Sequence, residues 1–296
     1  MFLKLHEPDR KISYLMNIDG RCKLSEDDGR TLFGYQLGYE GEHYFYQLLN
    51  EVTGGLKLWD ITLKESSKAQ FDFVVIGEGT VYHFDVKNYS GIYTYIDGLF
   101  KKENGSVDQT IMTQLKRADI ILSQFLMRNG YRYHHESRIV FVNESFRLKN
   151  FNGDSCIKFP NQVHDIINHL KQLGPPTQED YRLARALIEA NDPDVRRFAY
   201  YNFESLRKGY KCPKCKRYGR VTVLPNRKTV VCVCERKMAK SDYITECARQ
   251  MWILKNAPFK IQEIAAWSGC DKKTVQRALK KYCHYSGDKR ARMYWF

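Results

Sequence analysis

Short runs of apolar residues alternate along the first two thirds of the chain with longer stretches in which apolar residues recur every three or four positions. The short runs predict β-strands, and the longer periodic stretches predict amphipathic helices. Gly77, Gly79 and Gly91 mark turns between the strands. The pattern predicts strands at 71–76, 81–88, 91–96 and 138–143 and helices at about 36–52, 108–128, 160–173 and 178–190. This order is typical of an α/β fold in which helices pack on the faces of a mixed sheet.

Two of the predicted strands carry charged residues at positions where a buried strand is normally apolar. Asp72 interrupts the first strand, and Asp85 and Lys87 fall in the second. Side chains alternate between the two faces of a strand, so Asp85 and Lys87 share one face with His83. A buried charge costs several kcal/mol unless a partner or a metal compensates it. We therefore predict a chemical role for the two acids and the lysine, and we interpret His83 as a core histidine.

Carboxylates that converge from adjacent strands make an oxygen-rich site for a hard divalent cation, typically Mg²⁺, for which Mn²⁺ can substitute. Such a cation lowers the pKa of a bound water and holds a phosphate oxygen. Lys87, two positions from Asp85, could orient that water or stabilise charge that develops on the phosphate. The simpler alternative is an ordinary ion pair between Asp85 and Lys87, with Asp72 solvated. The spacing favours the metal site and leaves the ion pair open.

Polar residues on two predicted helices are further candidates. Glu42 lies on the same helical stripe as Phe45 and Leu49, and this apolar stripe is expected to face the sheet. Glu40 lies on a different stripe and remains open as the ligand in place of Glu42. In the second long helix, Gln114 stands at the edge of the apolar stripe, where a solvated glutamine is as good an interpretation as a site residue.

The spacing of these residues resembles a known nuclease core. Asp72, twelve further residues and then Asp85-Val86-Lys87 resemble the motif of the PD-(D/E)XK nuclease superfamily. More narrowly, residues from about 30 to 143 resemble the nuclease-related domain called NERD. Asp85 stands where this family usually has glutamate, a change that the wider superfamily accepts. The residues that carry the resemblance are Gly38-Tyr-Glu-Gly-Glu42, Gln70-Phe-Asp-Phe-Val-Val75, Phe84-Asp-Val-Lys-Asn-Tyr-Ser-Gly91 and Gln114.

The resemblance implies a restriction-endonuclease-like mixed sheet flanked by helices and a metal-dependent site that hydrolyses phosphodiester bonds. It implies three acidic residues around the metal, a backbone carbonyl as a further ligand, a catalytic lysine and a site glutamine. Carried over position by position, these are Glu42, Asp72 and Asp85, the carbonyl of Val86, Lys87 and Gln114.

Four of the nine cysteines form a cluster with the spacing of metal ligands. Two residues separate Cys212 from Cys215, one separates Cys232 from Cys234, and short apolar runs lie between the two pairs. Two pairs of thiolates on short strands are typical of a zinc ribbon with Zn²⁺ in a closed structural site. A redox pair is the alternative, but no thioredoxin-like strand and helix surround it. The segment at 210–238 is too short to bury a hydrophobic core that could fold without a metal ion.

The C-terminal segment has the spacing of a helix-turn-helix. Residues 261–269 predict a first helix that ends at Gly269, and Asp271 caps a second helix in which Val275 faces inward. The ending of basic and aromatic residues resembles the hairpin of a winged helix, and a small three-helix bundle with solvated lysines is the alternative. The predicted DNA contacts are Lys272, Lys273, Thr274, Gln276 and Arg277 in the second helix and Lys289, Arg290 and Arg292 in the hairpin.

The net charge of +14 over 296 residues comes from the C-terminal third of the chain. Residues 206–296 hold 23 Lys and Arg against 6 Asp and Glu, a net charge of +17, and the remainder has a net charge of −3. Such a basic domain attracts DNA or RNA and would deliver it to the nuclease-like half. An acidic membrane surface is the other polyanion considered. Because the sequence has no apolar run of about 18 residues, no signal-peptide core and no disulfide framework, we expect a soluble cytoplasmic protein.

These features together predict a metal-dependent nuclease acting on duplex DNA, with endonucleolytic cleavage favoured. The rival interpretation is a non-catalytic DNA-binding regulator that keeps the nuclease-like fold as a scaffold. RNA as substrate and a homodimer remain open, because nothing in the nuclease half reads the sugar and one active site usually breaks one strand. The predicted domains are a nuclease-like domain at 1–173, a helical connector at 174–209, a zinc ribbon at 210–238 and an all-α winged helix-turn-helix at 239–296.

Overall fold

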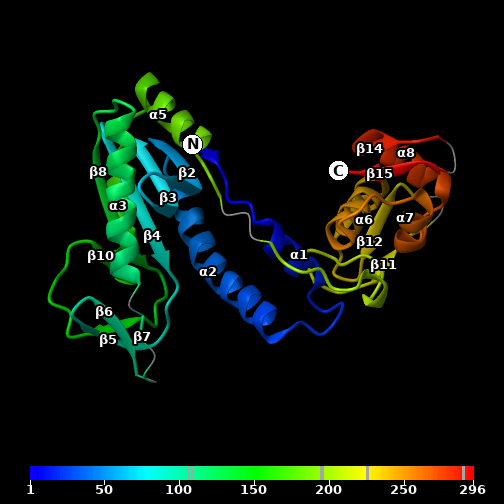
Figure 1. The fold of residues 1–296 in the computed structure, drawn as a ribbon, viewed down its shortest axis with the longest axis horizontal. Helices are drawn as coiled ribbons and strands as arrows, with labels where there is room; N and C mark the ends of the chain where they lie inside the picture. The colour runs from blue at the N-terminus through cyan, green and yellow to red at the C-terminus, as the bar shows by residue number, and fades with distance from the viewer. Residues whose placement is uncertain (104, 106, 109, 194–196, 225–226, 289–290) are drawn as a thin grey trace. The chain divides into compact units, whose positions relative to one another are not determined.

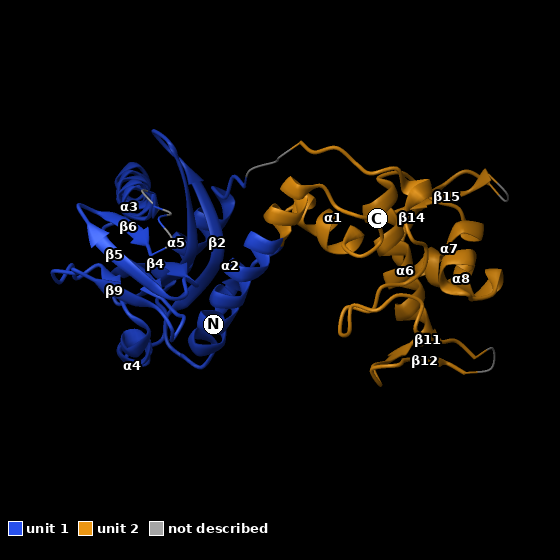
Figure 2. Ribbon diagram, turned by 90° about the horizontal axis from the view of Figure 1, so that it is seen from below, with its two compact units in different colours: residues 1–7, 33–195 blue, residues 8–32, 196–296 orange. Residues whose placement is uncertain are grey.

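The computed structural model describes residues 1–296 except 104, 106, 109, 194–196, 225–226 and 289–290. The described residues group into two compact units (Figure 2). Unit 1 comprises residues 1–7 and 33–195, and unit 2 comprises residues 8–32 and 196–296. Each unit is therefore assembled from two separate stretches of the chain.

Unit 1 is built on a six-stranded sheet with the strand order β1-β2-β3-β4-β8-β10 (Figure 1). Strands β2, β3 and β4 are antiparallel neighbours, whereas β1 with β2, β4 with β8, and β8 with β10 pair in parallel. This mixed sheet confirms the predicted α/β class. The strands span Phe2–Lys4 (β1), Leu56–Lys64 (β2), Lys68–Gly77 (β3), Thr80–Lys87 (β4), His134–Phe141 (β8) and Ile157–Lys158 (β10).

Helices cover both faces of this sheet, as the sequence predicts. On one face, α3 and α5 bury apolar side chains against β2 and β3. On the other face, α2 and α4 pack against β3, β4 and β8, and the side chains of Phe45 and Leu49 on α2 are fully buried there. The helices span Glu26–Asn50 (α2), Ile111–Arg128 (α3), Val163–Leu170 (α4, after the 3₁₀ turn η1 at Pro160–Gln162) and Gln178–Glu189 (α5).

A second, four-stranded sheet of unit 1 has the strand order β7-β6-β5-β9. It encloses an aromatic cluster in which the rings of Phe141 and Phe146 stack with their centroids 3.8 Å apart and Phe100 packs against Phe141. Phe141 is the β8 partner of Lys87 in the main sheet, so this cluster supports the end of β4 that carries the charged residues. The strands span Ile92–Ile96 (β5), Leu99–Lys102 (β6), Val107–Asp108 (β7) and Arg147–Lys149 (β9).

Helix α2 begins at Glu26, well before the predicted start at residue 36. The Asp28 N–H donates to Ser25 Oγ at 3.2 Å, which is the contact expected of a residue that caps a helix N-terminus. Three acidic residues occupy the first turn, where they interact favourably with the helix dipole. Several glycines in this stretch lower its helix propensity, which explains why the sequence pattern conceals the first turns.

Two further features of unit 1 differ from the sequence-based expectations. The sequence pattern does not predict β2, because the alternation of its apolar residues slips by one position at Asp60. Helix α5 falls in the stretch expected to be a connector, but Leu183, Ala184 and Leu187 bury against the sheet. Unit 1 consequently extends to residue 195 instead of ending at residue 173.

Unit 2 has its core around α6, a helix in a stretch for which the sequence pattern gives no prediction. Tyr243, Cys247 and Met251 of α6 are buried, and Tyr14 and Leu15 of α1 belong to the same apolar cluster. Strands β11, β12 and β13 form a three-stranded antiparallel sheet, and β14 pairs with β15 in a hairpin. The elements span Arg10–Ile18 (α1), Phe203–Ser205 (η2), Val221–Thr222 (β11), Thr229–Cys232 (β12), Lys237–Ala239 (β13), Lys240–Lys255 (α6), Ile261–Ser268 (α7), Lys272–Tyr282 (α8), His284–Ser286 (β14) and Met293–Trp295 (β15).

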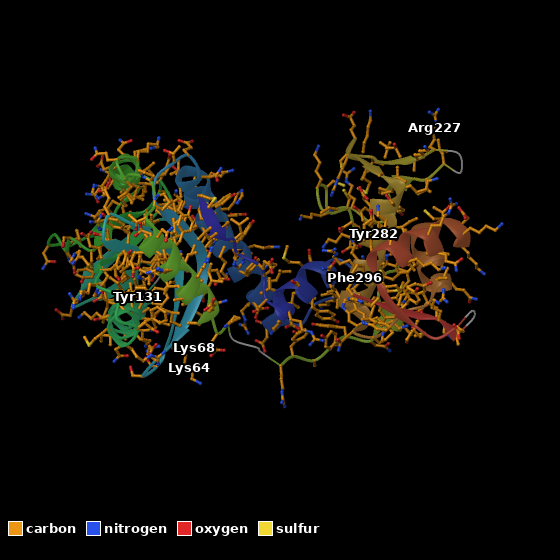
Figure 3. The ribbon with its side chains drawn as sticks, turned by 90° about the horizontal axis from the view of Figure 1, so that it is seen from above. Lys64, Lys68, Tyr131, Arg227, Tyr282 and Phe296 are labelled. Atoms are coloured by element: carbon orange, nitrogen blue, oxygen red, sulfur yellow. The ribbon has the colours of Figure 1, made fainter. Side chains whose placement is uncertain are left out.

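Many of the basic side chains of unit 2 lie on its surface. Arg227, at the tip of the β11–β12 connection, is one of them (Figure 3). In the described part of the chain, no helix combines the length and the apolar character needed to cross a bilayer.

Candidate active site and cysteine cluster

The main sheet of unit 1 forks between β3 and β4. The two strands pair from Gly77 with Thr80 to Phe73 with Phe84, which brings Asp72 and Asp85 to the next position. At this position a side chain replaces the backbone as the hydrogen-bond acceptor between the two strands. The Val86 N–H donates to Asp72 Oδ2 at 2.8 Å. Beyond it β3 continues beside β2 and β4 continues beside β8. The fork therefore places the two predicted acids next to each other.

An irregularity in β2 lies directly beside this fork. Trp59 pairs with Phe73 and Ile61 with Phe71, while Asp60 between them has a φ of +67°. A non-glycine residue in this left-handed region, in the middle of a strand, is a local distortion that the surrounding contacts must hold in place. Before Asp60, Leu58 faces α3 and Trp59 faces α2, as strand alternation requires. After Asp60 the alternation is shifted by one position, so Ile61 faces α3.

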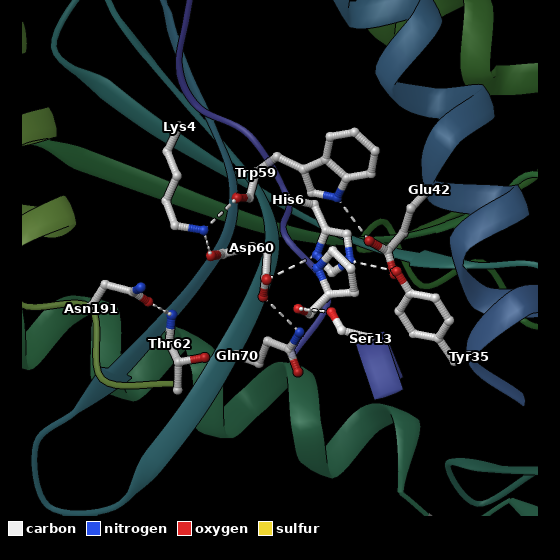
Figure 4. Close-up of polar contacts among 11 residues, drawn as sticks. Lys4, His6, Ser13, Tyr35, Glu42, Trp59, Asp60, Thr62, Gln70 and Asn191 are labelled. Carbon is white, nitrogen blue, oxygen red and sulfur yellow. Dashed lines mark hydrogen bonds and ion pairs between the residues drawn. The ribbon is translucent and has the colours of Figure 1, made fainter. Parts of the chain in front are cut away.

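Glu42 on α2 completes the acidic group at the fork. The indole Nε1 of Trp59 donates to Glu42 Oε2 at 2.8 Å (Figure 4). Burial raises the pKa of Glu42. Burial also holds the pKa of Asp72 well above its ordinary value, and the nearby charges of Glu42 and Asp85 raise it further. Three carboxylates therefore share one small region whose negative charge the protein compensates only in part.

Lys87 is the cation that the structure places in this region. Its Nζ lies 2.6 Å from Asp85 Oδ1, and the Asp85 side chain is largely buried. The charge of Lys87 also lowers the pKa of Asp72, although burial and the two acids outweigh it. The ion pair that the sequence left open is thus formed, and it lies within the acidic group instead of on a solvated strand edge.

The other sequence candidates of unit 1 differ in their exposure. Glu40 and Gln114 are both exposed, on α2 and α3 respectively. His83 is 1% exposed, its Nδ1 lies 3.2 Å from Ser137 Oγ, and burial lowers its pKa to about 4. His83 is therefore a neutral histidine of the core, as the sequence analysis interprets it. Its Nε2 is buried, and no described atom forms a hydrogen bond with it.

Comparison with family models identifies this region. Residues 37–142 match the model of NERD, the nuclease-related domain. The match begins in α2, ends just beyond β8 and contains all the residues of the fork. Residues 37–142 are therefore similar to a nuclease-related domain, which indicates a nuclease-related function for this part of the chain, and we call these residues the nuclease-related domain. No curated protein and no solved structure matches the chain.

The fork of the nuclease-related domain fits a hard cation by its chemistry. Its ligand candidates are the carboxylate oxygens of Glu42, Asp72 and Asp85, and oxygen atoms are the ligands that a hard divalent cation prefers. Among the described residues, a group of three or more ligand atoms within 4.8 Å of one another occurs at the four cysteines. The carboxylates of Glu42, Asp72 and Asp85 are not drawn together to that degree.

Gly41 is a residue of this domain whose role the sequence analysis does not recognise. A Cβ atom at Gly41 would lie 2.6 Å from Asn88 Cβ and 3.2 Å from Val142 Cγ2. Asn88, the residue after Lys87, donates its Nδ2 hydrogen to the Leu37 carbonyl at 2.9 Å. Helix α2 can therefore approach the end of β4 only because residue 41 has no side chain. This close approach brings Glu42 to the fork, and a glycine in a helix interior is the signal that could have revealed it.

We expect Gly41→Ala to lower the stability of the protein by about 1–3 kcal/mol, because the added methyl group overpacks the contact with Asn88. The matched control is Gly34→Ala in the same helix, where the new Cβ has nothing within 4 Å. That control should raise stability by about 0.5–1 kcal/mol. Urea unfolding of both variants measures the difference, and equal shifts of the two midpoints would disprove the role of Gly41.

The four cysteines Cys212, Cys215, Cys232 and Cys234 of unit 2 form a compact group. The Sγ atoms of Cys212 and Cys234 are 3.8 Å apart, those of Cys215 and Cys232 are 3.7 Å apart, and all four lie within 4.8 Å of one another. Each pair is followed by a tight turn with a left-handed residue, Lys216 or Glu235. Four converging sulfur atoms can hold a metal ion, and thiolate ligands suit a soft or borderline metal better than Mg²⁺.

Helices α7 and α8 of unit 2 meet through a short turn. Gly269 ends α7 with a φ of +69°, and Asp271 caps α8 by accepting a hydrogen bond from the Thr274 N–H at 2.9 Å. Val275 and Leu279 are buried, as the sequence predicts. The predicted contact residues on α8 separate into exposed Lys272, Lys273 and Arg277 and half-buried Thr274 and Gln276. In the hairpin, Arg292 packs over the Tyr285 ring, whereas Lys289 and Arg290 lie outside the described residues.

Proposed function

We propose that the nuclease-related domain hydrolyses phosphodiester bonds of DNA at the fork of its sheet, with Mg²⁺ or Mn²⁺ as cofactor. The observation that carries this proposal is the gathering of Glu42, Asp72, Asp85 and Lys87 at one point where two strands part. Buried like charges cost stability, so a folded protein keeps them where a ligand or a reaction needs them.

In the proposed mechanism, Asp72 and Asp85 would hold the cation with the Val86 carbonyl, and Glu42 of α2 would be a further ligand. The bound cation would lower the pKa of a water molecule and neutralise charge on the phosphate. The Trp59 indole keeps the Glu42 carboxylate turned toward the fork. Lys87 would hold the attacking water or donate to a phosphate oxygen that gains charge. In the hydrolysis the water oxygen bonds to phosphorus, and the departing sugar oxygen receives a proton.

Unit 2 would hold the DNA. We propose that its four cysteines bind Zn²⁺ in a zinc ribbon and that α7, α8 and the β14–β15 hairpin form a winged helix-turn-helix. The net charge of +17 over residues 206–296 and the exposed Lys272, Lys273 and Arg277 on α8 support contact with phosphates. Duplex DNA is the preferred partner, because the second helix of a helix-turn-helix, here α8, fits the major groove of B-form DNA.

Incubation with supercoiled plasmid tests the nuclease proposal directly. The purified chain should convert the plasmid to a nicked form with Mg²⁺ or Mn²⁺ and leave it supercoiled with EDTA. Direct conversion to linear plasmid would instead indicate paired active sites, as in a dimer. An intact plasmid at every metal and protein concentration, with bound metal and bound DNA both verified, would rule out hydrolysis.

The second candidate is a DNA-binding regulator without catalysis. It is favoured by the closed Asp85–Lys87 ion pair and by the spread of the three carboxylates, which do not gather within 4.8 Å of one another. A footprinting experiment separates the two functions. Sequence-specific protection that persists unchanged after addition of Mg²⁺ supports the regulator, whereas strand cleavage after addition supports the nuclease.

A further inference from the structure

Four aromatic side chains follow one another along helix α2 beside the proposed active site. They are Tyr35, Tyr39, His43 and Tyr46, and we call them the aromatic row. Successive rings have centroids 5.9, 5.5 and 5.7 Å apart and planes within 18°, 18° and 24° of parallel. Steps of four, four and three residues keep them on one side of the helix. The rings therefore form a continuous row in which neighbouring planes are nearly parallel.

The aromatic row is fixed from below by buried and hydrogen-bonded side chains. Trp59 is 4% exposed, and its ring stacks on Tyr39 at 5.9 Å and on Tyr46 at 4.8 Å. His6 joins the Tyr35 hydroxyl to Asp60, with Nε2 and Nδ1 each 2.9 Å from these partners (Figure 4). Rings held in this way lose little further freedom when a ligand stacks on them.

Phe45 and Leu49 are fully buried in the apolar cluster under α2, and Tyr46 of the aromatic row packs against that cluster. Tyr39 in contrast is 36% exposed, and Tyr35 and His43 are half-buried. The aromatic row is connected to the proposed active site through Trp59, which stacks on Tyr39 and Tyr46 and donates a hydrogen bond to Glu42. A partly exposed aromatic surface thus leads to the proposed point of cleavage.

We propose that the aromatic row stacks the bases of an unpaired nucleic acid strand and guides that strand to the fork. This inference rests on the proposed nuclease function and concerns the strand that enters the fork, whereas unit 2 would bind duplex DNA. The ring spacing of 5.5–5.9 Å exceeds the 3.4 Å rise per base of duplex DNA. Only a strand free to extend can place successive bases on successive rings, and aromatic side chains bind single strands in this way without reading their sequence.

The local charge gives the proposal a second consequence. Glu40 and Glu42 are on the same helix as the row, and residues 31–50 contain no lysine or arginine, so this stretch of α2 offers phosphates no excess of positive charge. Its contribution to binding comes from stacking, and it should depend little on salt, unlike the contribution of the basic unit 2.

Fluorescence anisotropy of the full chain in EDTA, with labelled oligothymidine and with a labelled duplex, tests the proposal. Tyr39→Ala should weaken oligothymidine binding by roughly 5- to 100-fold, because each stacked base contributes about 1–3 kcal/mol. Duplex binding should remain unchanged, Tyr39→Phe should restore oligothymidine binding, and the loss should persist at high salt. The matched control is Tyr44→Ala, since Tyr44 is 40% exposed on the same helix but lies off the row.

Equal losses for oligothymidine and duplex, or equal losses in Tyr39→Ala and Tyr44→Ala, would overturn the proposal. Thermal unfolding of each variant shows whether a loss of binding reflects misfolding. If Tyr39→Ala does not fold, Tyr39→Leu, which keeps apolar volume without a ring, should show the selective loss of oligothymidine binding. Because EDTA prevents cleavage, selective binding by a chain that never cleaves would refute the nuclease function and leave the stacking surface standing.

Discussion

Asp72→Asn should abolish metal-dependent cleavage and also raise the unfolding temperature of the metal-free protein. Loss of an anionic ligand should slow cleavage on the order of 10³-fold, because metal-assisted stabilisation of the transition state amounts to several kcal/mol. The asparagine keeps the hydrogen bond from the Val86 N–H, since its side-chain oxygen also accepts. Single-turnover plasmid nicking and thermal unfolding measure the two effects on one protein preparation.

The stability gain follows from the direction of the pKa shift. The pKa of Asp72 is higher in the folded chain than in the unfolded one, so the folded state binds its proton more tightly. The destabilisation therefore grows as the pH rises from the ordinary aspartate range through the folded pKa, and it is complete above it. An asparagine carries no charge at any pH. The advantage of the variant should accordingly disappear in acid, and it should shrink when Mg²⁺ is added to the parent protein.

Three further variants show which residues share this role. Lys87→Met should lose cleavage as Asp72→Asn does, whereas Glu40→Gln and Gln114→Ala should retain it, because both side chains are exposed. Full activity in the folded Asp72→Asn protein would refute the site. Loss of activity in Glu40→Gln with Glu42→Gln active would move the third acid to the neighbouring stripe of α2.

Removal of metal from the four-cysteine cluster is expected to have the other large effect. Cys212 and Cys232 are buried in the same apolar cluster as Tyr243 of α6, so a collapse of the ribbon would loosen the core of unit 2. Zinc sites in small peptides contribute on the order of 10 kcal/mol to folding. Cys212→Ser, or a strong chelator, should therefore remove the bound metal and the cooperative unfolding transition of unit 2.

Elemental analysis with circular dichroism checks this expectation. One zinc per chain is expected in the parent protein and none in Cys212→Ser. The matched control is Cys22→Ser, because Cys22 also belongs to unit 2 but not to the four-cysteine group. A parent protein that holds no metal, with its four thiols paired as disulfides, would contradict the structural metal site and favour the redox alternative.

The charged residues of the fork can be predicted from the sequence because they interrupt apolar strands. Asp85 and Lys87 stand in an otherwise apolar strand, and both strand alternation and local spacing are properties of neighbouring residues. Their register against Asp72 also follows from a short turn at Gly79. The sequence alone therefore predicts which side chains gather, although it does not predict how closely.

The contacts from outside these strands could not be predicted in the same way. The sequence pattern does not predict strand β2, because the positive φ of Asp60 shifts the alternation of its apolar residues. No neighbouring residue in the sequence indicates that shift. The need for glycine at position 41 depends on Asn88, which is distant in sequence. Contacts between residues distant in sequence decide both the shift at Asp60 and the need for glycine at position 41. Helix and strand propensities and the periodicity of apolar residues do not contain this information.

The interleaved assignment of the chain to its two units constrains how the protein can be dissected. Tyr14, Leu15 and Ile18 pack in the apolar cluster of unit 2, although they precede the nuclease-related domain in the sequence. A fragment truncated after residue 195 would leave these side chains without their partners and should aggregate. A fragment that contains unit 1 alone would have to omit residues 8–32 and rejoin residues 1–7, which include His6, to residue 33.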